Sequence, residues 1–212
     1  MKEFLPESHS DKGYGMVENG FGDRPALFLI DFQKGITADE DYSSKLVQNA
    51  VDNTVELLDA CRKKSLPIYY TVTAFREDND DTGKWKLESI FKWTEGSKYA
   101  EIDERLKEKD DEYVIIKKAG SAFFGTPLLN YLISKKIDTI LLTGLNTSGC
   151  IRATANDAHA HGYSCIIPAE CVGDVTCDDP DCPAHKQNLI DLNARYSDVV
   201  SVEKVLDYVN NL

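Results

Sequence analysis

Residues 138–168 read DTILLTGLNTSGCIRATANDAHAHGYSCIIP, and this stretch decides the fold. It predicts a strand over 138–144, a helix over 150–161 that Gly162 stops, and a second strand over 163–168. A strand, a helix and another strand in this order are typical of parallel strands joined by a crossover helix. The stretch also places Cys150 at the start of the helix.

Further strands are predicted on both sides of this unit. PALFLID at 25–31 is an almost continuous apolar run closed by a charge, the pattern of a parallel strand that is buried on both faces. The β-branched and aromatic residues of LPIYYTVT at 66–73 predict a second strand. EYVIIKK at 112–118 and DVVSV at 198–202 bring the total to six strands.

The segments between these strands carry helical signals. Apolar residues recur with a period near 3.6 over 41–64, and the same spacing is found over 183–196 and 203–212. Thr126 and Pro127 form a helix start, and this helix ends before Ile137. We therefore predict an α/β fold: a six-stranded, mostly parallel sheet with helices on both faces, in three α/β/α layers.

Composition limits the organisation and the partners of the chain. At about 150 residues per domain, 212 residues favour one domain, at 25–212, after a polar N-terminal arm at 1–24. A core can form, because 42% of the residues are hydrophobic and 9% are aromatic.

The net charge of −12 repels nucleic acid and anionic membranes. Without a signal peptide or an apolar run of about 20 residues, we expect a cytoplasmic protein.

Three reactive side chains are predicted to converge at one edge of the sheet. Asp31, Lys117 and Cys150 all follow predicted strands, and ligands of open parallel sheets bind at the carboxyl ends of strands. A thiol in the first helical turn beside a lysine is placed to act as a nucleophile. Asp31 can shuttle a proton, and Lys117 can hold both anions. Singly, the three residues also suit a turn cap, a solvated lysine and a core filler.

The surrounding motifs resemble a known family. SAFFGT at 121–126 and TSGCIRAT at 147–154 are its most specific strings, and the resemblance extends over residues 25–202. The chain is similar to the isochorismatase-like cysteine hydrolases, and most similar to their N-carbamoylsarcosine amidase-like amidohydrolases. The resemblance implies the isochorismatase-like fold.

The same resemblance assigns roles to single residues. The nucleophile of the family matches Cys150, its aspartate matches Asp31, and its lysine matches Lys117, with Lys118 as the alternative in register. The family also has a non-proline cis peptide bond, which maps onto Leu145–Asn146. The amide of this bond and that of Cys150 would form the oxyanion hole.

Two other branches of the family fit less well. Isochorismatases proper lack the cysteine, and nicotinamidases carry an aspartate and two histidines for a metal after the second strand, where TVTAFREDNDD at 71–81 has no histidine. The resemblance thus implies a metal-free, cofactor-free cysteine amidohydrolase. It would act on a small linear amide, N-carbamoyl or ureido compound through a Cys150 thioester, with release of ammonia. The alternatives are a maleamate- or nicotinamide-type amidase and a catalytically idle member that serves as a binding or assembly partner.

The substrate contacts are less well determined than the reaction. Arg152 would meet a substrate carboxylate, although an arginine on a helix more often forms an ion pair at the surface or between subunits. Trp93, Phe123 and Thr147 are candidate walls of the substrate site, and core packing is the equal alternative.

The remaining expectations concern the other cysteines and the assembly. A zinc site of Cys171, Cys177, Cys182 and His185 is disfavoured because structural zinc ligands pair as C-x₂₋₄-C, so we expect free thiols and no metal. The resemblance implies a homo-oligomer, a dimer or tetramer. The arm at 1–24 is too polar to fold against its own sheet alone, so we expect it to lie across a neighbouring subunit.

Overall fold

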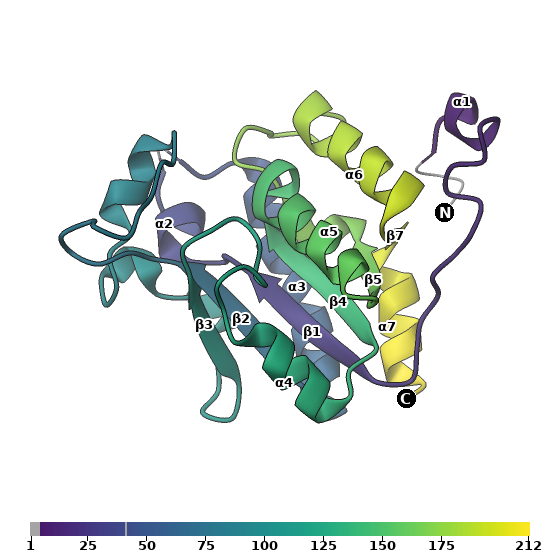
Figure 1. Ribbon diagram of the computed structural model, residues 1–212, viewed down its shortest axis with the longest axis horizontal. Coiled ribbons are helices and arrows are strands. Elements are labelled where there is room, and N and C mark those ends of the chain that lie inside the picture. The colour runs from purple at the N-terminus through teal and green to yellow at the C-terminus, as the bar shows by residue number, and fades with distance from the viewer. Residues whose placement is uncertain (1–4, 41) are drawn as a thin grey trace.

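The computed structural model describes residues 5–40 and 42–212; residues 1–4 of the predicted arm and Asp41 of the predicted 41–64 helix lie outside the described residues. A central sheet lies between two layers of helices, as Figure 1 shows. The predicted three-layer α/β/α architecture is therefore confirmed.

Every strand pair in the described sheet is parallel. The strands are β1 Pro25–Ile30, β2 Ile68–Thr73, β3 Tyr113–Lys117, β4 Thr139–Leu145, β5 Ser164–Pro168, β6 Val172–Gly173 and β7 Asp198–Val200. Their order is β3-β2-β1-β4-β5-β7, with β6 paired to β4. The sheet thus has one strand more than predicted, because the two residues of β6 are too few to form a sequence pattern.

The helices cover both faces of the sheet. They are α1 Glu7–Ser10, α2 Lys34–Thr37, α3 Lys45–Lys63, α4 Leu128–Lys135, α5 Arg152–Ala160, α6 Pro183–Arg195 and α7 Val202–Asn210. Helices α3 and α7 pack on one face, and α4, α5 and α6 pack on the other. Short 3-10 turns lie at Glu88–Lys92, Lys98–Ala100, Glu104–Leu106 and Ala169–Cys171.

The strand order creates the place for a site. From β1 the chain moves through β2 to β3 on one side, and then returns to place β4, β5 and β7 on the other side. The order therefore reverses between β1 and β4, where open α/β sheets bind ligands. At this point Gly144 has a φ of 125°, and a Cβ there would collide with the backbone of Ile30. Only glycine allows the two strands to approach so closely.

The described part of the N-terminal arm is fastened to its own chain. The amides of Asn19 and Gly20 donate to the Asp198 carboxylate at 3.3 and 2.7 Å, and the Phe21 ring stacks on Tyr208 at 4.3 Å. The expectation that the arm is too polar to fold against its own sheet is therefore wrong for these residues, and its contact with a neighbouring subunit stays a prediction. The sequence did not reveal these contacts because they join residues nearly 180 positions apart.

None of the described helices combines the length and the hydropathy needed to cross a membrane.

Candidate active site

Asp31 directly follows β1 and is 1% exposed. Its φ of 55° is a conformation that aspartate tolerates better than most residues, and it points the carboxylate away from the regular path of the strand. Two hydroxyls from β2 donate to this carboxylate: Thr71 Oγ1 to Oδ1 at 2.8 Å, and Thr73 Oγ1 to Oδ2 at 3.1 Å. The carboxylate is thus held in a fixed orientation below the surface.

Lys117 is the last residue of β3, and its side chain has no exposed surface. Its Nζ lies 2.8 Å from Asp31 Oδ2 and 3.3 Å from Cys150 Sγ. It also donates to Thr73 Oγ1 at 2.8 Å and to the carbonyl of Ala119 at 3.0 Å. Burial alone would lower the pKa of Lys117, but Asp31 and Cys150 outweigh burial and raise this pKa. Lys117 is therefore a buried ammonium ion that bridges the carboxylate and the sulfur.

Lys118, the alternative in register, points to a different set of partners. Its Nζ forms ion pairs with Asp81 and Glu95 and donates to the carbonyl of Ala74. The structure therefore brings Lys117, and not Lys118, to Asp31 and Cys150.

Cys150 lies in a π-helical turn, Thr147–Ile151, that joins β4 to α5. Helix α5 begins at Arg152, two residues later than predicted. The Cys150 residue is partly exposed, whereas Asp31 and Lys117 beneath it are buried.

The electrostatics of the thiol differ from the prediction. Burial raises the pKa of Cys150 to about 12; Lys117 opposes this shift, and the charge and hydrogen bonding of Asp31 add to it. Lys117 thus favours the thiolate, as expected, but burial outweighs this effect, so the expected low pKa of the thiol is wrong for the free protein. The thiol keeps its proton, and Asp31 is the group placed to accept it.

The predicted cis peptide bond is present between Leu145 and Asn146. The Asn146 carbonyl then accepts two backbone amides, from Gly149 at 2.9 Å and from Ile151 at 3.1 Å. The turn therefore folds back on Asn146 and carries Cys150 over the buried charges.

The predicted wall residues lie in different surroundings. Trp93 is buried and packs edge-on against Tyr42 at 5.8 Å, and the Tyr42 hydroxyl is within hydrogen-bonding reach of the Asn146 side chain. Trp93 is thus one residue removed from the nucleophile turn. Phe123 instead packs in the core beside Phe28, with ring centroids 6.4 Å apart. For Phe123 the core alternative accounts for the contacts observed.

Thr147 and Arg152 are both engaged by other parts of the chain. Thr147 Oγ1 donates to the Gly173 carbonyl at 3.0 Å and lies 2.8 Å from His185 Nδ1. Arg152 donates to Asn188 Oδ1 at 2.6 Å and approaches Asp191 at 3.8 Å, both on α6. These contacts match the ion-pair alternative for Arg152, and a role in substrate binding remains a prediction for both residues.

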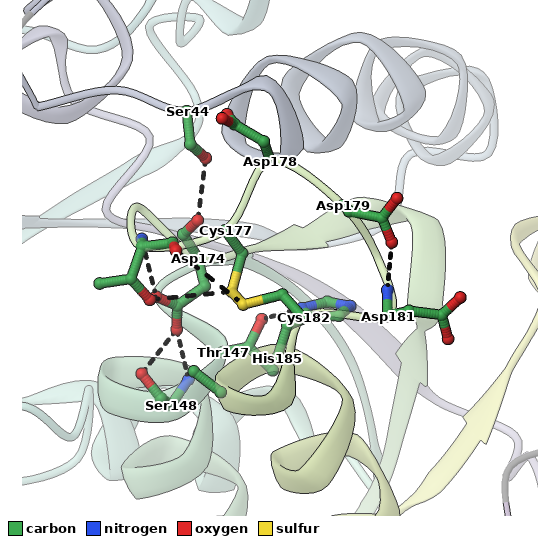
Figure 2. Close-up of a disulfide and its surroundings, with 12 residues drawn as sticks. Ser44, Thr147, Ser148, Asp174, Cys177, Asp178, Asp179, Asp181, Cys182 and His185 are labelled. Atoms are coloured by element: carbon green, nitrogen blue, oxygen red, sulfur yellow. Dashed lines mark hydrogen bonds between the residues drawn. A yellow bond between two sulfur atoms is a disulfide. The ribbon is translucent and has the colours of Figure 1, made fainter.

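The cysteines near the C-terminus are paired differently from the expectation. Cys177 and Cys182 form a disulfide, shown in Figure 2, so the expectation of free thiols is wrong for these two residues. The zinc alternative is wrong for the same reason, because disulfide sulfurs are not thiolate ligands. Cys61, Cys165 and Cys171 are free and buried. Within residues 5–40 and 42–212, no cluster of three or more His, Cys, Asp or Glu side chains is arranged to hold a metal ion.

Several residues around the site were not singled out from the sequence. Thr71 and Thr73 alternate along β2 and therefore share one face, which is a signal that the string TVT contains. Asp174 accepts hydrogen bonds from Ser148, and Tyr42 reaches Asn146. No local pattern assigned a role to Asp174 or Tyr42, because both come from loops that tertiary structure alone brings to the site.

Comparison with known proteins is consistent with this geometry. The family model described as Isochorismatase domain matches residues 25–204. The chain belongs to the isochorismatase family. The family resemblance predicted from the motifs is therefore confirmed.

Two curated relatives of the chain are named as an amidase and an amidohydrolase. The N-carbamoylsarcosine amidase of Arthrobacter sp is 34% identical over 201 residues, which cover 91% of this chain and 74% of that protein. The maleamate amidohydrolase of Pseudomonas putida is 35% identical over 198 residues, or 91% and 90% of the two chains. A solved isochorismatase family protein from Desulfovibrio vulgaris superposes with a TM-score of 0.80 at 25% identity, over 89% of this chain and 99% of that chain. The chain is thus an isochorismatase-family hydrolase with amidase relatives.

Proposed function

We propose that this protein is a metal-free cysteine amidohydrolase that cleaves the C–N bond of a small linear amide, N-carbamoyl or ureido compound. The observation that carries the proposal is the position of Lys117 Nζ, 2.8 Å from Asp31 Oδ2 and 3.3 Å from Cys150 Sγ. A base, a thiol and a cation that meet below a partly exposed cysteine are the groups that acyl transfer requires. The names of the amidase relatives support the same reaction class.

The first half of the reaction follows from the protonation states. Because the pKa of Cys150 is raised to about 12, the thiol transfers its proton to Asp31 as the sulfur attacks the carbonyl carbon. Lys117 remains protonated and stabilises the sulfur as negative charge develops on it. The carbonyl oxygen becomes an oxyanion, for which the amides of Asn146 and Cys150 are the proposed donors.

The second half reverses these roles. Asp31 returns the proton to the leaving nitrogen, the C–N bond breaks, and ammonia leaves a thioester on Cys150. Water then attacks the thioester carbonyl while Asp31 accepts a proton from it. The C–S bond breaks, the acid is released, and the proton on Asp31 restores the Cys150 thiol. The sum is amide plus water to acid plus ammonia.

A substrate panel tests the proposal. The wild-type protein is incubated with N-carbamoyl compounds, ureido compounds, maleamate and nicotinamide, and ammonia release is measured together with the mass of the Cys150 peptide. We expect ammonia from at least one linear compound and an acyl adduct on Cys150, both absent in Cys150→Ala, whose turnover should fall by several orders of magnitude. Absence of ammonia and adduct with every compound would favour an idle member that only binds.

Metal dependence is tested on the same substrate. The segment after β2 has no histidine, and the described residues offer no cluster of three or more ligands. We expect prolonged dialysis against a chelator to leave the rate unchanged. Loss of activity on chelation, with recovery on adding back one divalent metal ion, would contradict the metal-free part of the proposal.

A further inference from the structure

The loop that follows β6 runs along the nucleophile turn and bonds to it repeatedly. In β6, Gly173 pairs with Leu145, and its carbonyl accepts from Thr147 Oγ1 at 3.0 Å. The Val175 amide donates to Asn146 Oδ1 at 3.1 Å. The turn at 145–150 is therefore supported along its length by a second segment from elsewhere in the sequence.

Asp174 is the charged residue in this support, and its contacts are visible in Figure 2. It is 1% exposed, and its Oδ2 accepts from both the backbone amide of Ser148 at 3.0 Å and the Ser148 hydroxyl at 2.6 Å. Its Oδ1 accepts from the amide and the hydroxyl of Thr176 at 3.2 and 2.8 Å. Ser44 Oγ donates to the Asp174 carbonyl at 2.8 Å.

These bonds compensate a buried charge that has no cation partner. Among the ion pairs formed by the described residues, Asp174 takes part in none. A buried carboxylate is costly unless hydrogen bonds satisfy it, and bonds to a charged acceptor are about twice as strong as neutral ones. The Ser148 amide is therefore held more firmly than an ordinary turn amide.

Because of the position of Ser148, its bond to Asp174 affects the orientation of the neighbouring backbone amides. Ser148 lies between the cis peptide bond and Cys150, and the neighbouring amides of Gly149 and Ile151 are bound to the Asn146 carbonyl. The amides of Asn146 and Cys150 take part in none of these bonds. Fixing Ser148 from outside thus fixes the directions of the Asn146 and Cys150 amides on either side of it.

We propose that Asp174 is a positioning residue for the oxyanion hole, which holds the Asn146 and Cys150 amides toward the carbonyl oxygen of the substrate. This inference rests on the proposed amidohydrolase function. Asp174 does not touch the reacting atoms; it acts through Ser148. Its loss should weaken stabilisation of the tetrahedral intermediate and leave the thiol itself available to other electrophiles.

The test compares two reactions of the same sulfur in wild type, Asp174→Ala and Asp174→Asn. Amide hydrolysis passes through an oxyanion, whereas alkylation by iodoacetamide displaces iodide at a tetrahedral carbon and forms none. For Asp174→Ala we expect kcat to fall by about 10²-fold, the size of effect seen when one oxyanion donor is lost. KM and the alkylation rate of Cys150 should stay within about threefold of wild type, because neither depends on the oxyanion. Equal losses in both reactions would overturn the proposal and leave Asp174 as a support of the fold.

Matched variants separate the carboxylate from the loop. Asp178 lies on the same loop and is exposed, with its carboxylate bound to the Lys45 amide at 2.9 Å, so Asp178→Ala should leave kcat unchanged. Asp174→Asn keeps one acceptor oxygen and should retain more kcat than Asp174→Ala, which also guards against a variant that fails to fold. A loss in Asp178→Ala as large as in Asp174→Ala would contradict the specific role of Asp174.

A third measurement keeps the proposal testable if no amide substrate is found. A small aldehyde adds to the Cys150 thiol as a thiohemiacetal, in which the C–S bond forms and the thiol proton ends on the former carbonyl oxygen. This oxygen would occupy the oxyanion position, so the aldehyde should protect Cys150 from iodoacetamide about tenfold less well in Asp174→Ala than in wild type. Equal protection would overturn the inference, whereas missing ammonia release with unequal protection would contradict the proposed function alone.

Discussion

Two charge clusters lie next to each other at the end of β3, and they differ in burial more than in geometry. In one, Lys117 Nζ lies 2.8 Å from Asp31, and both side chains are at most 2% exposed. In the other, Lys118 Nζ lies 2.7 Å from Asp81, with side chains 36% and 26% exposed. Consecutive residues thus form ion pairs of nearly equal length in opposite surroundings.

The difference shows that distance alone does not indicate a functional pair. Water and dissolved ions screen the Lys118 pair, and such surface pairs contribute about 0–1 kcal/mol. Water does not reach the Lys117 pair to solvate a single charge, so removing either partner leaves an uncompensated buried charge. Only the buried pair therefore transmits its charge to a third group, the Cys150 sulfur.

The largest effect is expected for Asp31→Asn, which removes the proton acceptor from the buried cluster. Amide turnover should fall by about 10³- to 10⁴-fold, because the amide side chain cannot carry the proton. The alkylation rate of Cys150 at pH 8 should rise, because Asp31 raises the pKa of the thiol and Lys117 remains to lower it. Stopped assays of ammonia and of carbamidomethyl-Cys150 measure the two rates. A fall in both rates by the same factor would contradict the inferred effect of the buried Asp31 carboxylate on the Cys150 thiol.

The second prediction compares the two lysines directly. Lys117→Ala should lower turnover by about 10²-fold or more and the free energy of unfolding by about 3–5 kcal/mol, because Asp31 is left buried without its cation. Lys118→Ala should change the unfolding free energy by less than about 1 kcal/mol. Denaturant titration and steady-state kinetics on both variants measure this. Equal changes in turnover and unfolding free energy for the two variants would show that burial does not decide the difference between the two lysines.

The third prediction concerns pH. Since the pKa of Cys150 is raised to about 12, the thiolate fraction is small at neutral pH and grows as pH rises. The rate of Cys150 alkylation should therefore increase about tenfold per pH unit between pH 7 and 10, with no plateau. Mass spectrometry of the Cys150 peptide over this range measures the slope. A plateau below pH 8 would mean that Lys117 overcomes burial and that the free protein holds a thiolate.

The smallest effect is expected from salt. Raising sodium chloride from 0.1 to 1 M shortens the Debye length from about 10 to 3 Å and should weaken exposed pairs such as that of Lys118. The buried pair lies out of reach of dissolved ions. We expect kcat of the wild-type protein for the best substrate to change by less than about twofold. The same salt series on Lys117→Ala is the comparison. A strong salt dependence of kcat that Lys117→Ala abolishes would show that ions enter the site.

Patterns along the chain predicted six of the seven strands, most helix positions and the three residues of the buried cluster. These succeed because the signals are local: PALFLID ends in Asp31, and apolar periodicity marks α3. The two-residue β6 and the hydrogen bonds of Asp174 were missed because they depend on tertiary contact. The raised pKa of Cys150 was also missed, since the burial of a side chain is a property of the folded protein. The disulfide was not predicted because it depends on how the 177–182 loop folds, which the spacing of the cysteines does not determine.

The contacts of residues 19–22 change where the smallest independently folding fragment begins. The match to the family model and the first strand both start at residue 25, which suggests beginning a recombinant protein there. Such a cut would strip the stacking partner from Tyr208, the hydrogen bond that its hydroxyl gives to the Gly22 carbonyl, and two amide donors from Asp198. Protease trimming of the intact protein should therefore stop before residue 19, and recombinant versions that begin at residue 25 should express less well than those that begin near residue 5.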